Sequence, residues 1–334
     1  MKVLILAGGF ATRLWPLTEN RAKPLLLLDG KTILHHVLDQ VLADRDDGKI
    51  KEEDVIVLTN TKFEQDFRKE LDSIGFTDVQ IFLEDAKSDG EKMGALGAVW
   101  ACIEEYELRE SLCILAGDNL IPNFSIDQII CSDNEARLLV KDIGDRFEAR
   151  KFGVVELENS DKNELQRVVR FEEKPNEPNS TMVSTGFVGL GIDCFPVLEA
   201  YIQHTPDDLG GVFVALLESD REIQVLASEV DGIWFDVGSF ETYMEAHKLL
   251  HGSDKSIPSD HISNSTFSGA CFVGEGAMLE NCVVIDSIIY PGARLKDCRI
   301  SNCAIDSNCD LEGLDLCWKI VRQGTVLRVG KSVS

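Results

Sequence analysis

A short internal repeat in the last part of the chain restricts the possible folds most strongly. From about residue 262, a small residue is followed two positions later by a large apolar one, and every third unit returns after about sixteen residues. The pairs are Cys271/Val273, Ala277/Leu279, Cys282/Val284, Ser287/Ile289, Ala293/Leu295, Cys298/Ile300, Cys303/Ile305 and Cys309/Leu311. A coil with three short sides would bury each large residue and stack its equivalents, so we predict a small left-handed parallel β-helix. An antiparallel sandwich would instead show period-2 runs and hairpin turns.

The cysteines of the chain agree with this prediction. Six of the ten lie near the C-terminus, at Cys271, Cys282, Cys298, Cys303, Cys309 and Cys317. The sequence has no CxxC pair and no Cys/His cluster at zinc-site spacing, so a structural zinc site is not expected. The tight interior corners of a β-helix favour small side chains, and we therefore interpret these cysteines as buried, reduced packing residues.

The first 250 or so residues follow a different pattern, in which short aliphatic runs alternate with amphipathic stretches. The predicted strands are residues 3–6, 54–58, 79–83 and 112–116, and the predicted helices are residues 33–43, 62–74, 93–106 and 243–250. This alternation predicts an α/β fold, with a Rossmann-like mixed, mainly parallel sheet and helices on both faces. A chain of 334 residues favours two domains, which we place at residues 1–252 and 253–334.

The chain is strongly acidic. Its 58 acidic and 33 basic residues give a formal net charge of -25 and an isoelectric point of about 4.6. Nucleic acids and anionic membranes bind proteins through basic surfaces, so neither is an expected partner. No apolar run reaches the roughly eighteen residues of a membrane span, and the apolar run before Gly8 is too short for a signal peptide. We therefore expect a cytoplasmic protein.

A glycine turn follows the first predicted strand, in the segment LILAGGFATRLWPLTENRAKPLLLL. Gly8 and Gly9 lie at the carboxyl end of that strand, where a backbone without Cβ atoms can present N–H groups to a polyphosphate. Arg13, Arg21 and Lys23 form the densest basic cluster of this acidic chain. The segment contains neither GxxxxGK[ST] nor GxGxxG, which excludes a Walker A loop and a dinucleotide fingerprint. It predicts a phosphate-binding loop of another kind.

This segment resembles the signature of the sugar-phosphate nucleotidylyltransferase family, GGxGTRLxPLT followed by KPLLP. It differs at Ala11, where glycine is usual, and at Leu27-Leu28, where Leu-Pro is common. The resemblance implies that the turn binds a nucleoside triphosphate through the residues Leu6, Ala7, Gly8 and Gly9. It also implies that Arg13 binds the nucleotide and its leaving pyrophosphate, and that Lys23 supports the phosphate at the reacting centre.

Two aspartates follow predicted strand ends. Asp118 in CILAGDN comes directly after a buried strand, and Asp236 in GIWFDVGSFETYMEA follows a short aromatic strand. A single aspartate at such a place is commonly a turn or capping residue, but two of them in a chain with a phosphate loop favour a metal site. Mg²⁺ takes oxygen ligands, typically one or two carboxylates with substrate phosphates and water. Both segments resemble the family's GD and W-x-D-x-G…Y-x-x-A motifs, which implies that Asp118 and Asp236 bind Mg²⁺.

Two further segments, FGVVELEN and RVVRFEEKPNEPNSTMVSTGFVGL, resemble the family's YGVVE…FEEKP…S-x-TGxY block. The resemblance implies that Glu173 accepts a hydrogen bond from a sugar hydroxyl and that Lys174 binds the phosphate of the sugar. It further implies that Gly153 and Gly186 allow the backbone to approach the sugar ring. Phenylalanine replaces the usual tyrosine at positions 152 and 187, so hydroxyl contacts are not expected there.

The sequence signal for the segment that would contact the nucleoside is weaker than the signals for the phosphate and sugar sides. EKMGALGAVWA opens a predicted helix and loosely resembles the family's G-x-x-x-A-L segment, which implies a nucleotide contact at Gly94. Glu84 and Asp85 end the preceding strand, where the family often reads the base with an amide side chain. The alternative is that Gly94 and Gly97 only relieve the packing of this helix against the sheet.

The motifs together imply a sugar-1-phosphate nucleotidylyltransferase, which makes a nucleoside diphosphate sugar and pyrophosphate. The predicted catalytic residues are Arg13, Lys23, Asp118, Lys174 and Asp236, with Mg²⁺ as the cofactor. We favour glucose 1-phosphate with dTTP or UTP as substrates, and mannose-1-phosphate guanylyltransferase is the alternative enzyme. A catalytically silent regulatory or scaffold relative is the alternative of another class. The open ends of the β-helix favour a homo-oligomer.

Overall fold

The computed structural model describes the chain except for residues 10, 43–49, 86–92, 159–164, 252–260 and 330–334. Contacts divide the chain into two compact units. The first unit comprises Met1–Phe10 and Leu34–Asp236, and the second comprises Ala11–Ile33 and Val237–Ser334. The predicted domain boundary at residues 252 and 253 lies outside the described residues. The segment that follows the glycine turn is thus grouped with the C-terminal repeat.

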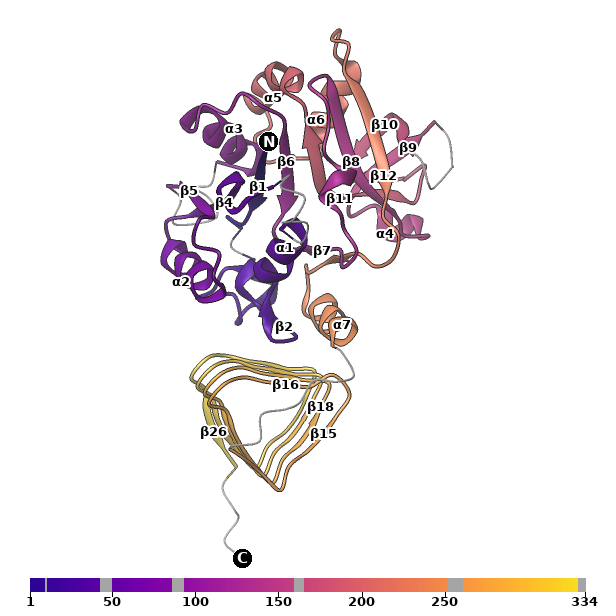
Figure 1. Ribbon diagram of the computed structural model, residues 1–334. Helices are drawn as coiled ribbons and strands as arrows, with labels where there is room; N and C mark the ends of the chain where they lie inside the picture. The colour runs from indigo at the N-terminus through magenta and orange to yellow at the C-terminus, as the bar shows by residue number, and fades with distance from the viewer. Residues whose placement is uncertain (10, 43–49, 86–92, 159–164, 252–260, 330–334) are drawn as a thin grey trace, which may run out of the picture. The chain divides into compact units, whose positions relative to one another are not determined.

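The first unit is built on a nine-stranded sheet with the order β5-β4-β1-β6-β11-β8-β12-β10-β9 (Figure 1). Its strands are β1 (Lys2–Leu6), β4 (Val55–Asn60), β5 (Gln80–Glu84), β6 (Leu112–Ala116), β8 (Glu135–Asp142), β9 (Gly153–Leu157), β10 (Gln166–Glu173), β11 (Met182–Leu190) and β12 (Gln224–Glu229). β1 pairs parallel with β4 and β6, β5 with β4, and β12 with β8. The pairings of β9, β10 and β11 are antiparallel. The prediction of an α/β fold with a mixed sheet is confirmed.

Both faces of this sheet are covered. Val3, Leu4 and Ile5 of β1 are each fully buried, although consecutive side chains of a strand point to opposite faces. On one face, Leu4 shares a hydrophobic core with α3 (Ala95–Glu105), α5 (Phe195–Ile202) and α6 (Gly211–Glu218). The other helices are α1 (Ile33–Val41), α2 (Glu64–Ile74) and α4 (Arg146–Ala149), while α7 (Phe240–Leu250) belongs to the second unit. No helix in the described part of the chain combines the length and the apolar character needed to cross a membrane.

The second unit contains the predicted β-helix, which Figure 1 shows as stacked triangular coils. Its three sides are parallel sheets with the orders β14-β17-β20-β23-β26, β15-β18-β21-β24 and β16-β19-β22-β25. The strands are β14 (Ile262–Ser263), β15 (Thr266–Ser268), β16 (Phe272–Val273), β17 (Met278–Glu280), β18 (Val283–Ile285), β19 (Ile288–Ile289), β20 (Arg294–Lys296), β21 (Arg299–Ser301), β22 (Ala304–Ile305), β23 (Asp310–Glu312), β24 (Asp315–Cys317), β25 (Ile320–Val321) and β26 (Val326–Arg328). Leu279, Leu295 and Leu311 pair in one column of the core, as the repeat predicts.

The cysteines of the repeat are buried with one exception. Cys271, Cys282, Cys298, Cys303 and Cys309 lie in the hydrophobic core of the β-helix, as predicted. Cys317 is exposed, so the prediction that it is a buried packing residue is wrong. The physical reason is strand alternation, because the preceding residue, Leu316, is the one that packs against the core.

Candidate active site

The glycine turn and Asp118 meet because β1 and β6 are adjacent parallel strands. The register pairs Leu6 with Ala116, so the two strands end at the same edge of the sheet. The N–H of Gly117 donates to the Leu6 carbonyl at 2.9 Å, and Asp118 follows directly. A Cβ at Gly117 would lie 2.6 Å from that carbonyl oxygen, which restricts this position to glycine. Two predicted site segments are therefore in contact at the carboxyl edge, where ligands bind in open α/β sheets.

Two polar side chains from neighbouring strands support the glycine turn. Asn60 ends β4, and its Nδ2 donates to the Gly8 carbonyl at 2.9 Å. Glu84 ends β5; it is buried, and its Oε2 lies 3.4 Å from where a Cβ of Gly8 would be. Its Oε1 accepts a hydrogen bond from the Met93 N–H. Asn60 was not among the predicted site residues, although a polar residue at the end of the apolar run VIVLTN is a recognisable signal.

Two short strands bring Asp118 and Asp236 together. β7 (Asn119–Leu120) pairs antiparallel with β13 (Phe235–Asp236), and the register places Asp236 opposite Asn119. Cα atoms of residues opposite each other in such a pair lie about 4.5–5.5 Å apart. Asp236 is therefore close to Asn119, and Asp118 is the residue directly before Asn119. Both aspartates are half-buried. This pairing joins parts of the sequence that are more than one hundred residues apart.

Asn119 and Trp234 orient the first aspartate. Nδ2 of Asn119 donates to Oδ1 of Asp118 at 3.0 Å, and Nε1 of Trp234 donates to Oδ1 of Asn119 at 2.7 Å. Asn119 is 7% exposed, so its amide is held in a largely dry environment. Asn119 and Trp234 belong to the same motifs as the two aspartates, GDN and W-x-D, but neither was a predicted site residue.

The two carboxylates suit a hard divalent cation. Asp118 lies in the turn directly before β7 and Asp236 lies on β13, the partner of β7, so two half-buried carboxylates stand near each other as possible oxygen ligands of one ion. Within the described residues, no group of three or more His, Cys, Asp or Glu side chains is placed to hold a metal ion. The common pattern for Mg²⁺ is one or two carboxylates completed by substrate phosphates and water, and two carboxylates suit that pattern. The assignment of Asp118 and Asp236 as Mg²⁺ ligands stays a prediction.

Glu173 and Lys174 stand at the end of β10, beside the start of β9. The register pairs Glu173 with Gly153, and the Lys174 N–H donates to the Phe152 carbonyl at 3.0 Å. Lys174 has a φ of 44°, which is uncommon for a residue with a side chain. Its ammonium lies 3.0 Å from Oε1 of Glu173, and its side chain is 64% exposed. The backbone of the predicted sugar-phosphate cation is thus held in place while its charge stays accessible.

The carboxylate of Glu173 fits against two glycines. A Cβ at Gly153 would lie 2.9 Å from Oε2 of Glu173 and 2.3 Å from Cζ of Phe171. A Cβ at Gly210 would lie 2.2 Å from the same oxygen and 2.9 Å from the same ring atom. Gly153 therefore has a packing role, and its predicted contact with the sugar ring stays a prediction. Gly210 was not selected from the sequence.

The sugar-side residues connect to the aspartates within the first unit. Gly186 has a φ of 80°, and a Cβ there would lie 3.0 Å from Cβ of Ala116, at the end of β6. The rings of Phe152 and Trp234 pack edge to face with centroids 5.0 Å apart. A chain of direct contacts therefore runs through Lys174, Phe152, Trp234, Asn119 and Asp118.

Gly94 packs tightly at the start of α3. It has a φ of 84°, and a Cβ there would lie 2.6 Å from the Pro206 carbonyl oxygen. The N–H groups of Leu96 and Gly97 donate to the same carbonyl at 2.9 and 3.1 Å. Packing accounts for glycine at this position, and the predicted nucleotide contact of Gly94 stays a prediction.

The two cations of the phosphate loop belong to the second unit. Arg13 lies in the 3₁₀ turn Thr12–Leu14 and is exposed, while Lys23 begins the 3₁₀ turn Lys23–Leu25 and is half-buried. Pro24 suits the start of such a turn because its ring fixes φ. The predicted catalytic residues therefore fall into two groups. Asp118, Lys174 and Asp236 lie in the first unit, and Arg13 and Lys23 lie in the second.

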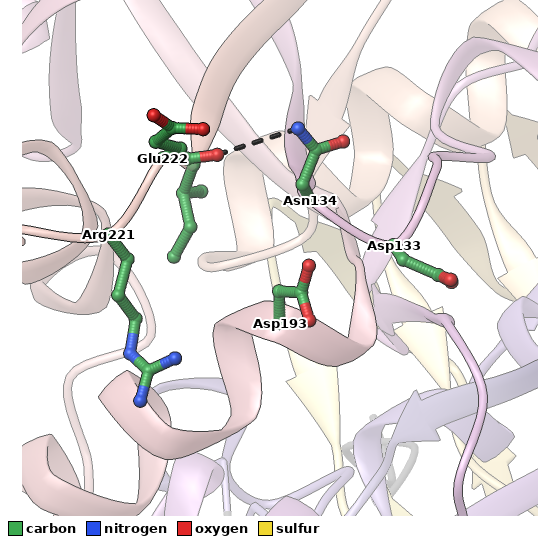
Figure 2. A pocket seen from close by; sticks show the side chains of 6 residues that line it. Asp133, Asn134, Asp193, Arg221 and Glu222 are labelled. Carbon is green, nitrogen blue, oxygen red and sulfur yellow. Dashed lines mark hydrogen bonds between the residues drawn. The ribbon is translucent and has the colours of Figure 1, made fainter.

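A surface depression at the opposite edge of the sheet holds none of the predicted site residues. Figure 2 shows its lining by Asp133, Asn134, Asp193, Arg221, Glu222 and Ile223. Asn134 and Ile223 directly precede β8 and β12, so this depression lies at the amino ends of two parallel strands. Nδ2 of Asn134 donates to the Glu222 carbonyl at 3.5 Å, and this hydrogen bond joins two of the residues that line the depression. Ligands of α/β sheets bind at the carboxyl edge, so this depression is not the candidate active site.

Comparison with known proteins agrees with this geometry. The profile of the Nucleotidyl transferase family matches residues 2–253. A similar solved structure is that of a Bacillus anthracis protein in complex with a sucrose, to which glucose-1-phosphate thymidylyltransferase activity has been attributed. It matches with a TM-score of 0.59 at 22% identity, over 78% of this chain and 98% of that chain, which supports a shared fold. Since the family profile covers most of the sequence, this chain belongs to the nucleotidyl transferase family and is a nucleotidyltransferase.

Proposed function

We propose that this nucleotidyltransferase joins a nucleoside triphosphate to a sugar 1-phosphate and releases pyrophosphate. The pairing of β7 with β13 carries the proposal, because it sets Asp118 and Asp236 side by side at the sheet edge that also holds the Gly8 turn. Glucose 1-phosphate with dTTP or UTP is the favoured substrate pair. Mannose 1-phosphate with GTP is the alternative pair.

In the proposed reaction, an oxygen of the sugar 1-phosphate attacks the α-phosphorus of the triphosphate. The bond between that phosphorus and the bridging oxygen breaks, and pyrophosphate leaves with its electron pair. Backbone N–H groups at Gly8 and Gly9 would hold the triphosphate, and the guanidinium fork of Arg13 would bind the departing pyrophosphate. Lys174 would bind the phosphate of the sugar, and Glu173 would accept a hydrogen bond from a sugar hydroxyl.

Positioning and charge neutralisation would account for the rate. The attacking phosphate oxygen is already ionised near neutral pH, so the reaction requires no general base. Mg²⁺ held by Asp118 and Asp236 would neutralise phosphate charge in the reacting complex. Because the chain carries a formal net charge of -25, the local cations Lys23 and Lys174 are needed to bring two polyanions together.

The test is a matrix of nucleoside triphosphates against sugar 1-phosphates with Mg²⁺, read by pyrophosphate release. The first pair to assay is glucose 1-phosphate with dTTP, which corresponds to the activity attributed to the Bacillus anthracis protein. Asp118→Asn should lower kcat by about 10²-fold or more. Asp127→Asn, at an exposed aspartate in another turn, is the matched control and should leave kcat unchanged. If no pair releases pyrophosphate, the proposal fails and a silent relative is favoured.

A further inference from the structure

One side of the β-helix is buried on its outer surface. In the sheet β16-β19-β22-β25, Ile289 and Ile305 face the core of the coil. Their neighbours Ile288 and Ala304 pair with each other across the sheet and point to the other side, yet both are fully buried. A β-helix side that faced solvent would expose these positions, so this side is covered by other parts of the second unit.

A partly buried ion pair joins the covered side to the segment that carries the two cations of the predicted phosphate-binding loop. Nη2 of Arg21 lies 3.0 Å from Oδ1 of Asp306, whose side chain is 3% exposed. The guanidinium of Arg21 also stacks over the ring of Tyr290, 4.7 Å from its centroid. Tyr290 and Asp306 follow β19 and β22 directly, so they occupy equivalent places on successive coils.

A second anchor lies six residues further along the same segment. The Leu27 N–H donates to the hydroxyl of Tyr290 at 3.1 Å, and the hydroxyl of Tyr243 in α7 donates to the Leu27 carbonyl at 2.5 Å. The two hydroxyls are 2.9 Å apart. One consistent set of protons satisfies all three contacts, with Tyr290 donating to Tyr243. Burial raises the pKa of both tyrosines, which keeps these hydroxyls protonated as donors.

A third contact fixes the hairpin formed by β2 (Leu27–Leu28) and β3 (Lys31–Thr32), which pair antiparallel. The Asp29 N–H donates to Nδ1 of His247 in α7 at 3.2 Å, and Nε2 of His247 lies 3.2 Å from the Ala270 carbonyl. His247 is fully buried. An imidazole that accepts at Nδ1 and donates at Nε2 is neutral, and it links the hairpin to the first coil of the β-helix.

Lys23 lies between the first two anchors. Arg21 is two residues before it and contacts Asp306 and the ring of Tyr290. Leu27 is four residues after it and donates its N–H to the hydroxyl of Tyr290. The Leu26 N–H donates to the Lys23 carbonyl at 3.0 Å, which closes the 3₁₀ turn between the anchors. The backbone on each side of this lysine is therefore held by side chains of the β-helix and α7.

We propose that the side β16-β19-β22-β25 of the β-helix acts as a positioning platform for the phosphate loop. Asp306, Tyr290 and Tyr243 are buried, and they are positioning residues that act through Arg21 and Leu27 on Lys23. This role rests on the proposed function, in which Lys23 supports the phosphate at the reacting centre. It makes the β-helix a part of the catalytic apparatus and not only an appended domain.

The experiment uses the full-length chain with Asp306→Asn and, separately, Tyr290→Phe. Each change keeps side-chain volume: the first removes the charge that pairs with Arg21, and the second removes the hydroxyl that accepts from the Leu27 N–H. We expect faster amide hydrogen exchange in residues 12–28 and a fall in kcat of up to about 10²-fold, since displacements of about 1 Å have effects of this size. KM for either substrate should change less than kcat. Arg21→Gln combined with Asp306→Asn should lower kcat no further than either change alone, because both break the same pair.

The matched control is Asp310→Asn. Asp310 pairs with Arg328 at 2.7 Å on a different side of the β-helix, so this change also breaks an Asp–Arg pair but should leave exchange and kcat unaltered. Unchanged exchange in residues 12–28 of both test variants would overturn the platform. Faster exchange with wild-type kcat would also overturn it, because the loop would then be held without consequence for the reaction. If the wild-type chain is inactive with every substrate pair, the proposed function fails, and the exchange measurement still decides whether the anchors exist.

Discussion

Replacing Trp234 by phenylalanine removes one hydrogen-bond donor and retains an aromatic ring. Nε1 of Trp234 donates to Asn119 at 2.7 Å, and Asn119 donates to Oδ1 of Asp118 at 3.0 Å. The ring of Trp234 also packs on Phe152 with centroids 5.0 Å apart, a contact that phenylalanine can largely preserve. The substitution therefore tests whether the orientation of the Asn119 amide matters to the candidate cation site.

The expected change in Mg²⁺ affinity follows from Oδ1 of Asn119, the acceptor that loses its donor in this variant. A net hydrogen bond contributes about 0.5–1.5 kcal/mol, and a buried acceptor that loses its donor costs about 1–3 kcal/mol. About 1.4 kcal/mol corresponds to a factor of ten. Hydrogen bonds to metal ligands from outside the coordination sphere contribute about 10–100-fold to metal affinity or activity. We therefore expect the Mg²⁺ concentration at half-maximal rate to rise about tenfold in Trp234→Phe.

Two measurements check this expectation. Initial rates of pyrophosphate release over a range of Mg²⁺ concentrations give the half-saturation point, and calorimetric titration of the chain with Mg²⁺ and a non-reacting triphosphate gives the affinity directly. Trp318→Phe is the control, because Trp318 also packs edge to face on a phenylalanine, Phe240, with centroids 6.0 Å apart in the other unit. The reasoning is refuted if Trp234→Phe binds Mg²⁺ like the wild type while its melting temperature is unchanged.

Three other substitutions or reactions have defined outcomes. Lys174→Ala should raise the KM for the sugar 1-phosphate about 10–100-fold, the equivalent of one charge-assisted hydrogen bond, and an unchanged KM in initial-rate assays would remove Lys174 from the sugar site. Gly210→Ala should raise the same KM and destabilise the fold by about 1–3 kcal/mol in thermal melts, because its Cβ would lie 2.2 Å from Oε2 of Glu173. One thiol per native chain should react rapidly with a disulfide reagent at pH 8, since Cys317 is exposed and the other nine cysteines are buried. Burial raises the pKa of Cys102 to about 12, so at pH 8 that thiol is protonated and unreactive; Cys317→Ser should abolish the rapid phase.

Local periodicity was sufficient to predict the coils of the β-helix and the first four strands of the large sheet, but not β8 to β12. The predicted strand at residues 112–116 coincides with β6, and the helix predicted at residues 62–74 forms as α2 (Glu64–Ile74). The sixteen-residue return of the repeat predicted the columns of the β-helix, because equivalent residues of successive coils must stack. These features depend on neighbours within one turn, one strand or one coil, which a single sequence records directly.

Some residues of the candidate site could also be predicted from the sequence. Asp118 and Asp236 were identified by their places at strand ends, and the pairing of β7 with β13 sets Asp236 opposite Asn119, the residue after Asp118. Asn60 and Gly210 were not identified, because their roles depend on Gly8 and Glu173, which lie elsewhere in the sequence. Cys317 was misassigned because the repeat reports spacing, and which side of a strand faces the core depends on register.

Composition and short-range spacing were enough to predict the two architectures, the acidic character of the chain and the order of the motifs. Tertiary structure alone decided that Ala11–Ile33 joins the unit of the β-helix, and that Arg21 is paired with Asp306, 285 residues away. The physical reason is that burial of a charge requires a specific partner at hydrogen-bond distance. Periodicity shows that a face is apolar, but only the packed chain shows which distant residue covers it.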